Sequence, residues 1–138
     1  MSSVFSKIVS GEIPSYKVAE TDDYLAFLDV NPLAKGHTLV IPKKETDYLF
    51  DLTDEDYSGL QLFSKRVALT IRKIIPCKRI GMAVIGLEVP HAHIHLVPIN
   101  GMNDLNFQNL KLRFSANEMQ ETAAALQKAY ADLSKAVQ

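Results

Sequence analysis

The sequence predicts a single α+β domain built on a five-stranded antiparallel sheet with two main helices. Extended segments occur in a run of three and a run of two, and two long segments carry apolar residues at helical three- and four-residue steps. Short turns within each run favour antiparallel pairing. At 138 residues and 47% apolar composition, the chain can build one hydrophobic core and is short for two. We therefore assign residues 1–138 to one domain.

The amino-terminal third is predicted to hold a short helix and the first run of strands. Ser3 can cap a helix over residues 4–10, and Gly11 can end it. Turn residues at Asp22 and at Asn31-Pro32 separate the extended segments. The three strands are predicted over residues 16–20, 24–30 and 36–41.

The clearest helix is predicted over residues 53–75. Carboxylates occupy its first turn, where they favour the positive end of the helix dipole, and Pro76 ends it. Its apolar stripe consists of Tyr57, Leu60, Phe63, Val67, Ile71 and Ile74. Leu62 and Leu69 point roughly 180° away from that stripe, at ~100° per residue.

The second run of strands and the last helix follow. Strands are predicted over residues 80–85 and 89–99, with Gly86 between them. Ser115 and Glu118 form the sequence pattern of a capping box. The helix that it begins has an apolar stripe of Met119, Ala123, Leu126, Tyr130, Leu133 and Val137.

Composition narrows the possible partners and the location. A net charge of −1 and a pI of about 6.4 provide no basic field for nucleic acid. The start of the chain lacks the apolar run of a signal peptide, and no stretch approaches the ~18 apolar residues of a membrane span. Cys77 is the single cysteine of the sequence. We expect a cytoplasmic protein that binds neither nucleic acid nor membrane.

Three of the four histidines alternate along the last predicted strand. Successive side chains of a strand point to opposite faces, so His91, His93 and His95 should share one face. The intervening residues are small or apolar and can pack on a helix. We expect the imidazoles to form a row along a cleft, because a core would not readily bury them.

Such a row suits chemistry at phosphorus. A neutral imidazole can attack phosphorus and form a phosphoramidate, while flanking rings donate hydrogen bonds to phosphoryl oxygens. The sequence lacks the glycine-rich loop of P-loop enzymes, which argues against a kinase. Two alternatives stay open: a structurally bonded row, and a zinc site that His37 could complete.

The segment Val-Pro-His-Ala-His-Ile-His-Leu-Val-Pro, residues 89–98, resembles the His-φ-His-φ-His signature of the histidine-triad (HIT) family. Residues 5–14, 25–32 and 36–44 resemble three further segments of that family, in the same order along the chain. The resemblance covers residues 4–98. The tail over 99–138, with a strand or loop and a helix, matches less specifically.

The resemblance implies a role for each matching position. His93 would be the nucleophile that forms a nucleotidyl-histidine with an α-phosphate, His91 and His95 would bind phosphate, and His37 would support the cluster. Asp29 would contact the ribose hydroxyls or, alternatively, only begin the turn at Asn31. The base would be enclosed by five apolar side chains, which could equally be plain core: Phe5, Ile8, Phe27, Val30 and Leu39.

The resemblance also implies the activity. We expect a hydrolase or transferase for a purine nucleotide derivative, either a phosphoramidate or a dinucleoside polyphosphate, that requires no cofactor or metal. The alternatives are a nucleotide-binding scaffold with negligible turnover and a zinc-binding module. The chain departs from the family pattern in a shortened loop before the triad, where Glu88 could be an acid or base near the phosphate or a charge at the strand edge.

Family members are commonly two-fold dimers, so we expect a homodimer with the sheet continued across it. Leu62 and Leu69 would lie in its contact. Basic residues surround these two leucines like a polar rim: Lys65, Arg66, Arg72 and Lys73.

Overall fold

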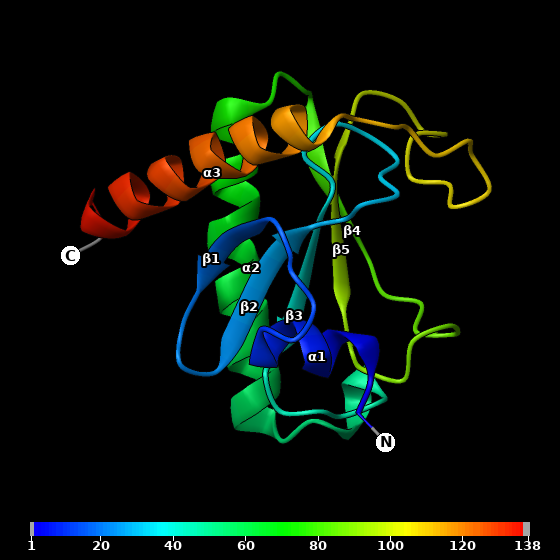
Figure 1. Cartoon of the computed structure of the whole chain (residues 1–138), viewed down its shortest axis with the longest axis vertical. Coiled ribbons are helices and arrows are strands. Elements are labelled where there is room, and N and C mark those ends of the chain that lie inside the picture. The colour runs from blue at the N-terminus through cyan, green and yellow to red at the C-terminus, as the bar shows by residue number, and fades with distance from the viewer. Residues whose placement is uncertain (1, 137–138) are drawn as a thin grey trace.

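Five antiparallel strands form one sheet in the order β1-β2-β3-β5-β4 (Figure 1). A computed structural model describes residues 2–136. The strands are β1 (Lys17–Glu20), β2 (Tyr24–Leu28), β3 (Thr38–Pro42), β4 (Arg79–Ala83) and β5 (Ile94–Ile99). The predicted runs of three and two are confirmed, because β1, β2 and β3 pair in sequence and β4 pairs with β5. The two runs join where β3 pairs with β5.

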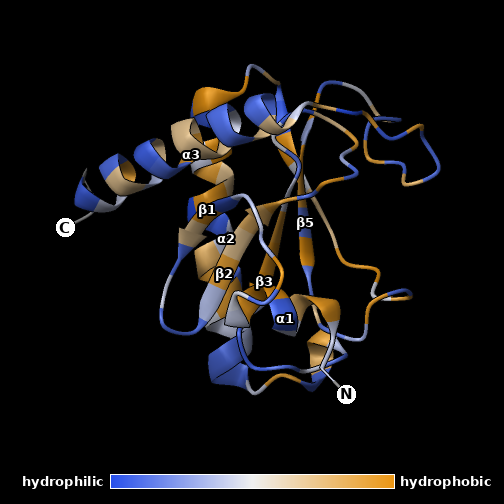
Figure 2. Ribbon diagram, viewed as in Figure 1, coloured by the Kyte–Doolittle hydropathy of each residue, from blue (hydrophilic) through white to orange (hydrophobic). Residues whose placement is uncertain are grey.

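The helices lie on both faces of the sheet. The elements are α1 (Val4–Ser10), the 3-10 turn η1 (Leu49–Asp51), α2 (Asp54–Ile74) and α3 (Ala116–Ala136). In Figure 1, α1 lies in front of the sheet and α2 behind it. The larger core lies between the sheet and the long helices, and a smaller core lies under α1. Figure 2 shows β2 and β3 largely apolar, whereas α3 alternates between polar and apolar turns.

The predicted caps are formed. The Ser3 hydroxyl accepts the Ser6 N–H at 3.0 Å, and Gly11 takes the left-handed conformation that ends α1. At the start of α3, the Ser115 N–H donates to the Glu118 carboxylate and the Glu118 N–H donates to the Ser115 hydroxyl, each at 3.1 Å. These contacts are local, so the sequence could predict them.

One residue of the predicted stripe on α2 is not in the core. Ile74 is 38% exposed, whereas the next residue, Ile75, is buried at 8%. Helical periodicity fails here because α2 ends at Ile74, and the chain then turns Ile75 against Gly36. On α3, the predicted positions Met119, Ala123 and Leu126 are buried. Val137 lies outside the described residues.

The strand predicted over residues 89–99 begins only at Ile94, and this prediction was wrong for its first five residues. Pro90 has no N–H to give to a ladder, and the Ala92 N–H donates to the carbonyl of Thr46 at 2.7 Å. Residues 84–93 therefore form a loop beside the sheet. Of the triad, only His95 belongs to a strand. No helix within residues 2–136 is long and apolar enough to cross a membrane.

Candidate active site

A cavity of about 820 Å³ opens on the α1 side of the sheet. It lies between α1, the ends of β2 and β3, and the loops before and after β5. All six side chains predicted to contact the nucleoside line it: Phe5, Ile8, Phe27, Asp29, Val30 and Leu39. Four of the apolar ones are also core residues, whereas Val30 is 65% exposed at the mouth.

The three triad rings lie close together around Phe5, but they do not share one face of a strand as predicted, because only His95 lies in β5. The ring centroids of His93 and His95 are 5.0 Å apart, and Phe5 presents its ring edge-on to both His91 and His93. The expectation that no core would bury them was wrong, because the three side chains are only 0%, 6% and 9% exposed in chain order. Burial is possible because each ring has a hydrogen-bond partner.

The backbone determines which nitrogen of His93 carries a proton. Its Nδ1 lies 2.7 Å from the carbonyl oxygen of His91. A carbonyl can only accept, so Nδ1 is the donor and a neutral ring keeps its lone pair on Nε2. The His93 side chain also lines the cavity. Nε2 of this ring is therefore free to accept a hydrogen bond or to act as a nucleophile.

A second chain of bonds determines the state of His95. The Leu33 N–H donates to His37 Nδ1 at 3.0 Å, so the proton of a neutral His37 is on Nε2. That Nε2 lies 3.0 Å from Nδ1 of His95, which must accept. His95 then carries its proton on Nε2 and becomes a hydrogen-bond donor at the cavity. His37 thus lies behind the row, where it supports His95.

His91 is held away from the cavity. Its Nε2 donates to the carbonyl of Pro42 at 2.7 Å, and its Nδ1 lies 2.8 Å from the hydroxyl of Ser3. The ring is absent from the cavity lining, unlike those of His93 and His95. The geometry gives His91 a supporting position rather than the predicted direct contact with phosphate.

Burial holds the supporting rings neutral. Desolvation lowers the pKa of His37 to about 4 and that of His95 to about 3, and it also lowers the pKa of His91. At neutral pH these rings act as hydrogen-bond donors and acceptors without a charge. Of the described residues that line the cavity, Lys111 is the one Lys or Arg.

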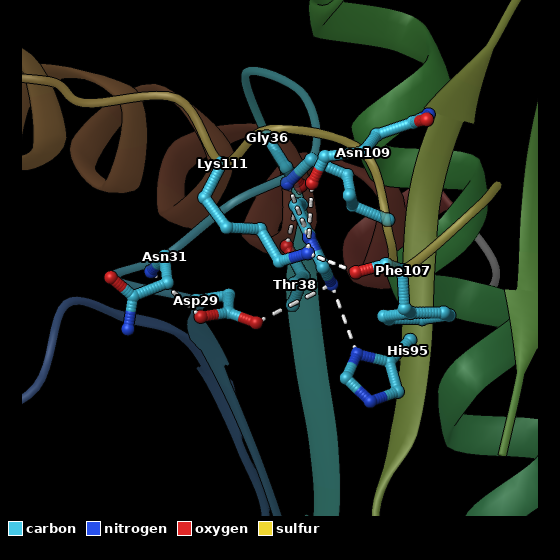
Figure 3. Close-up of polar contacts among 10 residues, drawn as sticks. Asp29, Asn31, Gly36, Thr38, His95, Phe107, Asn109 and Lys111 are labelled. Carbon is cyan, nitrogen blue, oxygen red and sulfur yellow. Dashed lines mark hydrogen bonds and ion pairs between the residues drawn. The ribbon is translucent and has the colours of Figure 1, made fainter. Parts of the chain in front are cut away.

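Asp29 fits both interpretations made from the sequence. Its Oδ1 accepts the Asn31 N–H at 2.8 Å, which is the turn contact, and its Oδ2 lies 3.6 Å from His37 Nε2. The carboxylate also lines the cavity, and burial raises its pKa. Figure 3 shows Asp29 and His95 on either side of this network, with the Lys111 side chain extending toward them from the loop that precedes α3.

Sequence reasoning missed three residues beside the triad. The Phe107 ring lies 4.6 Å from that of His95, and the Lys111 ammonium donates to the carbonyls of Phe107 and Asn109. Glu45 accepts hydrogen bonds from Ser3 and Ser6 beside His91. The loop over 100–115 has no periodicity, and Glu45 is separated from its partners by about 40 residues, so no local pattern indicates these contacts.

Glu88 lies on the loop before the triad, exposed at the edge of the cavity. It is not a strand-edge charge, because residues 84–93 are outside the sheet. Among residues 2–136, one group has the spacing of metal ligands: Asp29, His37 and His95, whose donor atoms lie within 4.8 Å of one another. His95 is the one member of the triad that belongs to this group.

The site combines a histidine whose Nε2 is free, a backbone carbonyl that orients its ring and a cavity lined largely by apolar side chains, on the sheet of an α+β domain. Residues 10–102 match the model of the HIT domain. The chain belongs to the HIT family.

Relatives and solved structures agree with this assignment. An uncharacterized HIT-like protein of Borreliella burgdorferi is 40% identical over 109 residues, which cover 69% of this chain and 73% of that one. An adenosine 5′-monophosphoramidase of Schizosaccharomyces pombe is 38% identical over 99 residues, covering 71% and 74%. The crystal structure of a zinc-bound histidine triad family protein from Mycobacterium smegmatis matches with a TM-score of 0.81 at 32% identity, over 99% and 98% of the two chains.

Proposed function

We propose that the protein is a nucleotide hydrolase or transferase that acts on the α-phosphate of a purine nucleoside monophosphate derivative. The observation that carries the proposal is the 2.7 Å contact from His93 Nδ1 to the carbonyl of His91, which leaves the lone pair on Nε2. In the first step this lone pair attacks phosphorus, the bond to the leaving group breaks, and a nucleotidyl-histidine forms. Water then attacks the same phosphorus, the bond from phosphorus to Nε2 breaks and one water proton passes to solvent, which releases the nucleoside monophosphate and neutral His93.

Other side chains of the cavity have matching roles in this proposal. The Nε2–H of His95 donates to a non-bridging phosphoryl oxygen, and Asp29 accepts from the ribose hydroxyls. The base lies between the apolar side chains of α1, β2 and β3. In this proposal Glu88, which lines the cavity, gives the leaving group its proton, or else only adds a negative charge to the rim.

The relative from S. pombe, an adenosine 5′-monophosphoramidase, supports an amine as the leaving group. A dinucleoside polyphosphate is the other substrate class that fits a nucleotidyl intermediate. The cytoplasmic location stays a prediction from composition.

Covalent trapping tests the proposal. Wild-type protein mixed with adenosine 5′-phosphoramidate and quenched within milliseconds should gain the mass of one nucleoside monophosphate, and peptide mapping should place it on His93. Because the ring is buried against Phe5, His93→Ala leaves a void, so His93→Gln is the better-packed companion variant. Both variants should lack the adduct. Nucleotide binding without an adduct on wild type would favour the scaffold alternative, and an adduct on both variants would remove His93 from the role.

We also propose a homodimer, with an outer face of α2 in its contact. Leu62 and Leu69 are 60% and 51% exposed on that face, as their angular position predicted. β4 is the last strand of the sheet, and Met82 on it is exposed. An edge strand beside an apolar helix face suits continuation of the sheet into a second copy.

A zinc-binding module is the second candidate function, favoured by the cluster of Asp29, His37 and His95. The zinc-bound relative from M. smegmatis adds weight to it.

A further inference from the structure

A hydrogen-bonded cluster of Ser3, Ser6 and Glu45 contacts His91 on the side away from the cavity. Ser3 Oγ lies 2.8 Å from His91 Nδ1, and Ser6 Oγ lies 3.4 Å from the same atom. Glu45 Oε1 accepts both the backbone N–H of Ser3, at 2.6 Å, and the hydroxyl of Ser6, at 2.7 Å. The cluster joins the start of α1, the segment after β3 and the triad loop.

The direction of each bond follows from what its ends can do. The carbonyl of Pro42 only accepts, so Nε2 of His91 holds the proton and Nδ1 of the neutral ring accepts. The Ser3 hydroxyl therefore donates to His91, while its oxygen accepts the Ser6 N–H. The single hydroxyl proton of Ser6 goes to Glu45. Every donor in the cluster has one acceptor.

The carboxylate of Glu45 is suited to anchor this arrangement. Hydrogen bonds from the backbone N–H of Ser3 and then from the hydroxyl of Ser6 lower the pKa of Glu45 to about 2. The side chain therefore stays ionised and can only accept across the pH range in which a neutral imidazole works. Because this carboxylate always accepts, the hydrogen bonds made by Ser3 and Ser6 keep one fixed direction.

His91 in turn positions the nucleophile, because its carbonyl oxygen receives the proton of His93 Nδ1. That carbonyl is on the 84–93 loop and not in the β5 ladder, so sheet pairing does not hold it in place. Within residues 2–136, the His91 ring is held by Pro42 on one nitrogen and by Ser3 on the other. Loss of the second bond would let the ring and its carbonyl shift.

We propose that Glu45 and Ser3 are positioning residues that act through His91 to keep Nδ1 of His93 bonded and its Nε2 aimed at phosphorus. This inference rests on the proposed function, since it assumes that His93 is the nucleophile. Neither residue touches the substrate. The amino-terminal cap of α1 thereby serves a second purpose, because the hydroxyl that caps the helix also orders the triad.

Two pairs of variants test the hydrogen bonds that link Glu45 and Ser3 to His91. The Ser3 pair separates their effect from helix capping, and the Glu45 pair separates it from the effect of the charge. Ser3→Gly removes the hydroxyl yet remains an acceptable N-cap, whereas Ser3→Thr keeps both functions. Glu45→Ala removes the acceptor, whereas Glu45→Gln keeps an acceptor oxygen without the charge. Glu12→Gln neutralises an exposed glutamate in the loop after α1 and is the matched control.

Two measurements test whether these hydrogen bonds position His93. The first is the single-turnover rate of nucleotidyl transfer to His93, measured together with the dissociation constant of the nucleoside monophosphate. Ser3→Gly and Glu45→Ala should slow transfer by about tenfold to a hundredfold with an unchanged dissociation constant, because a small misplacement of the reacting group is enough for this loss. Ser3→Thr and Glu12→Gln should keep the wild-type rate, and Glu45→Gln should fall between.

The second measurement needs no turnover. In spectra of protein labelled with ¹⁵N-histidine, the His91 Nδ1 resonance should move in Ser3→Gly, and the His93 Nδ1–H should exchange with solvent at least about tenfold faster than in wild type. Unchanged His91 and His93 signals in Ser3→Gly and Glu45→Ala would overturn the inference, and so would a rate loss matched by an equal loss of nucleotide affinity. Absence of an adduct on wild-type protein would instead contradict the proposed function, whatever the spectra show.

Discussion

His37 Nε2 and His95 Nδ1 lie 3.0 Å apart, and the hydrogen bond between them links the turn after β2 to the strand that carries the end of the triad. The Leu33 N–H fixes the proton on His37 Nε2, so the pair is complete only while both rings are neutral. If His95 also became protonated at Nδ1, two N–H donors would face each other inside the protein.

Acid should therefore destabilise the fold in a defined window. An unfolded histidine titrates near 6.5, whereas the folded pKa is about 4 for His37 and about 3 for His95. Between pH 6.5 and 4 the unfolded chain binds protons that the folded chain does not. The free energy of unfolding is thus highest above pH 6.5 and falls as the pH is lowered, by about 2 kcal/mol per ring between pH 6.5 and 5.

Urea unfolding at pH 7, 6 and 5 measures this slope. His37→Asn should be less stable at pH 7 because it disrupts a buried pair, and its stability should depend less on pH than that of wild type. A wild type that is equally stable at pH 5 and pH 7 would show that the two rings are not held neutral.

The nucleoside contact of Asp29 can be separated from its turn contact. Asp29→Asn keeps an oxygen for the Asn31 N–H, whereas Asp29→Ala loses both roles. We expect Asp29→Asn to weaken ribonucleotide binding by about 1.5–3 kcal/mol, the range of a hydrogen bond to a charged group, and to leave binding of the 2′,3′-dideoxy nucleotide unchanged. Calorimetry with both ligands checks this. Equal losses for both would restrict Asp29 to the turn.

Catalysis should proceed without a metal ion. A zinc ion on Asp29, His37 and His95 would have to displace the proton that the two imidazoles share, and it would lie near the ammonium of Lys111, whose charge also lowers the pKa of His37. We expect activity to persist after exhaustive chelation and the purified protein to hold far less than one zinc per chain. Stoichiometric zinc whose removal abolishes activity would favour the zinc-module alternative.

The dimer should depend on the outer face of α2. Leu62→Glu combined with Leu69→Glu places four carboxylates in a two-fold contact and should halve the mass measured by light scattering at micromolar concentration. Met102→Glu, at a fully exposed apolar residue in the loop after β5, is the control and should leave the mass unchanged. A monomeric wild type would contradict the dimer, and a dimeric double variant would place the contact elsewhere.

The sequence by itself determined features that depend on residues close together in the chain. Ser3 and Ser115 cap helices through contacts that span three residues, and both caps are formed. The strand runs and their antiparallel pairing follow from the extended segments and the short turns between them. The alternating histidines indicated the site by their spacing, whereas the apolar residues of the cavity wall were expected from the resemblance to the HIT family.

Tertiary structure decided the features that depend on distant partners. Ala92 bonds to Thr46, so the triad enters the sheet at Ile94 instead of Val89. The protonation state of each buried ring is set by a backbone group from another segment, as with Leu33 for His37 and Pro42 for His91. Periodicity describes which face a side chain takes, but it carries no information about the donor or acceptor that the fold brings to that face. The histidines could be found from their spacing, whereas their burial and their roles came from the packing around them.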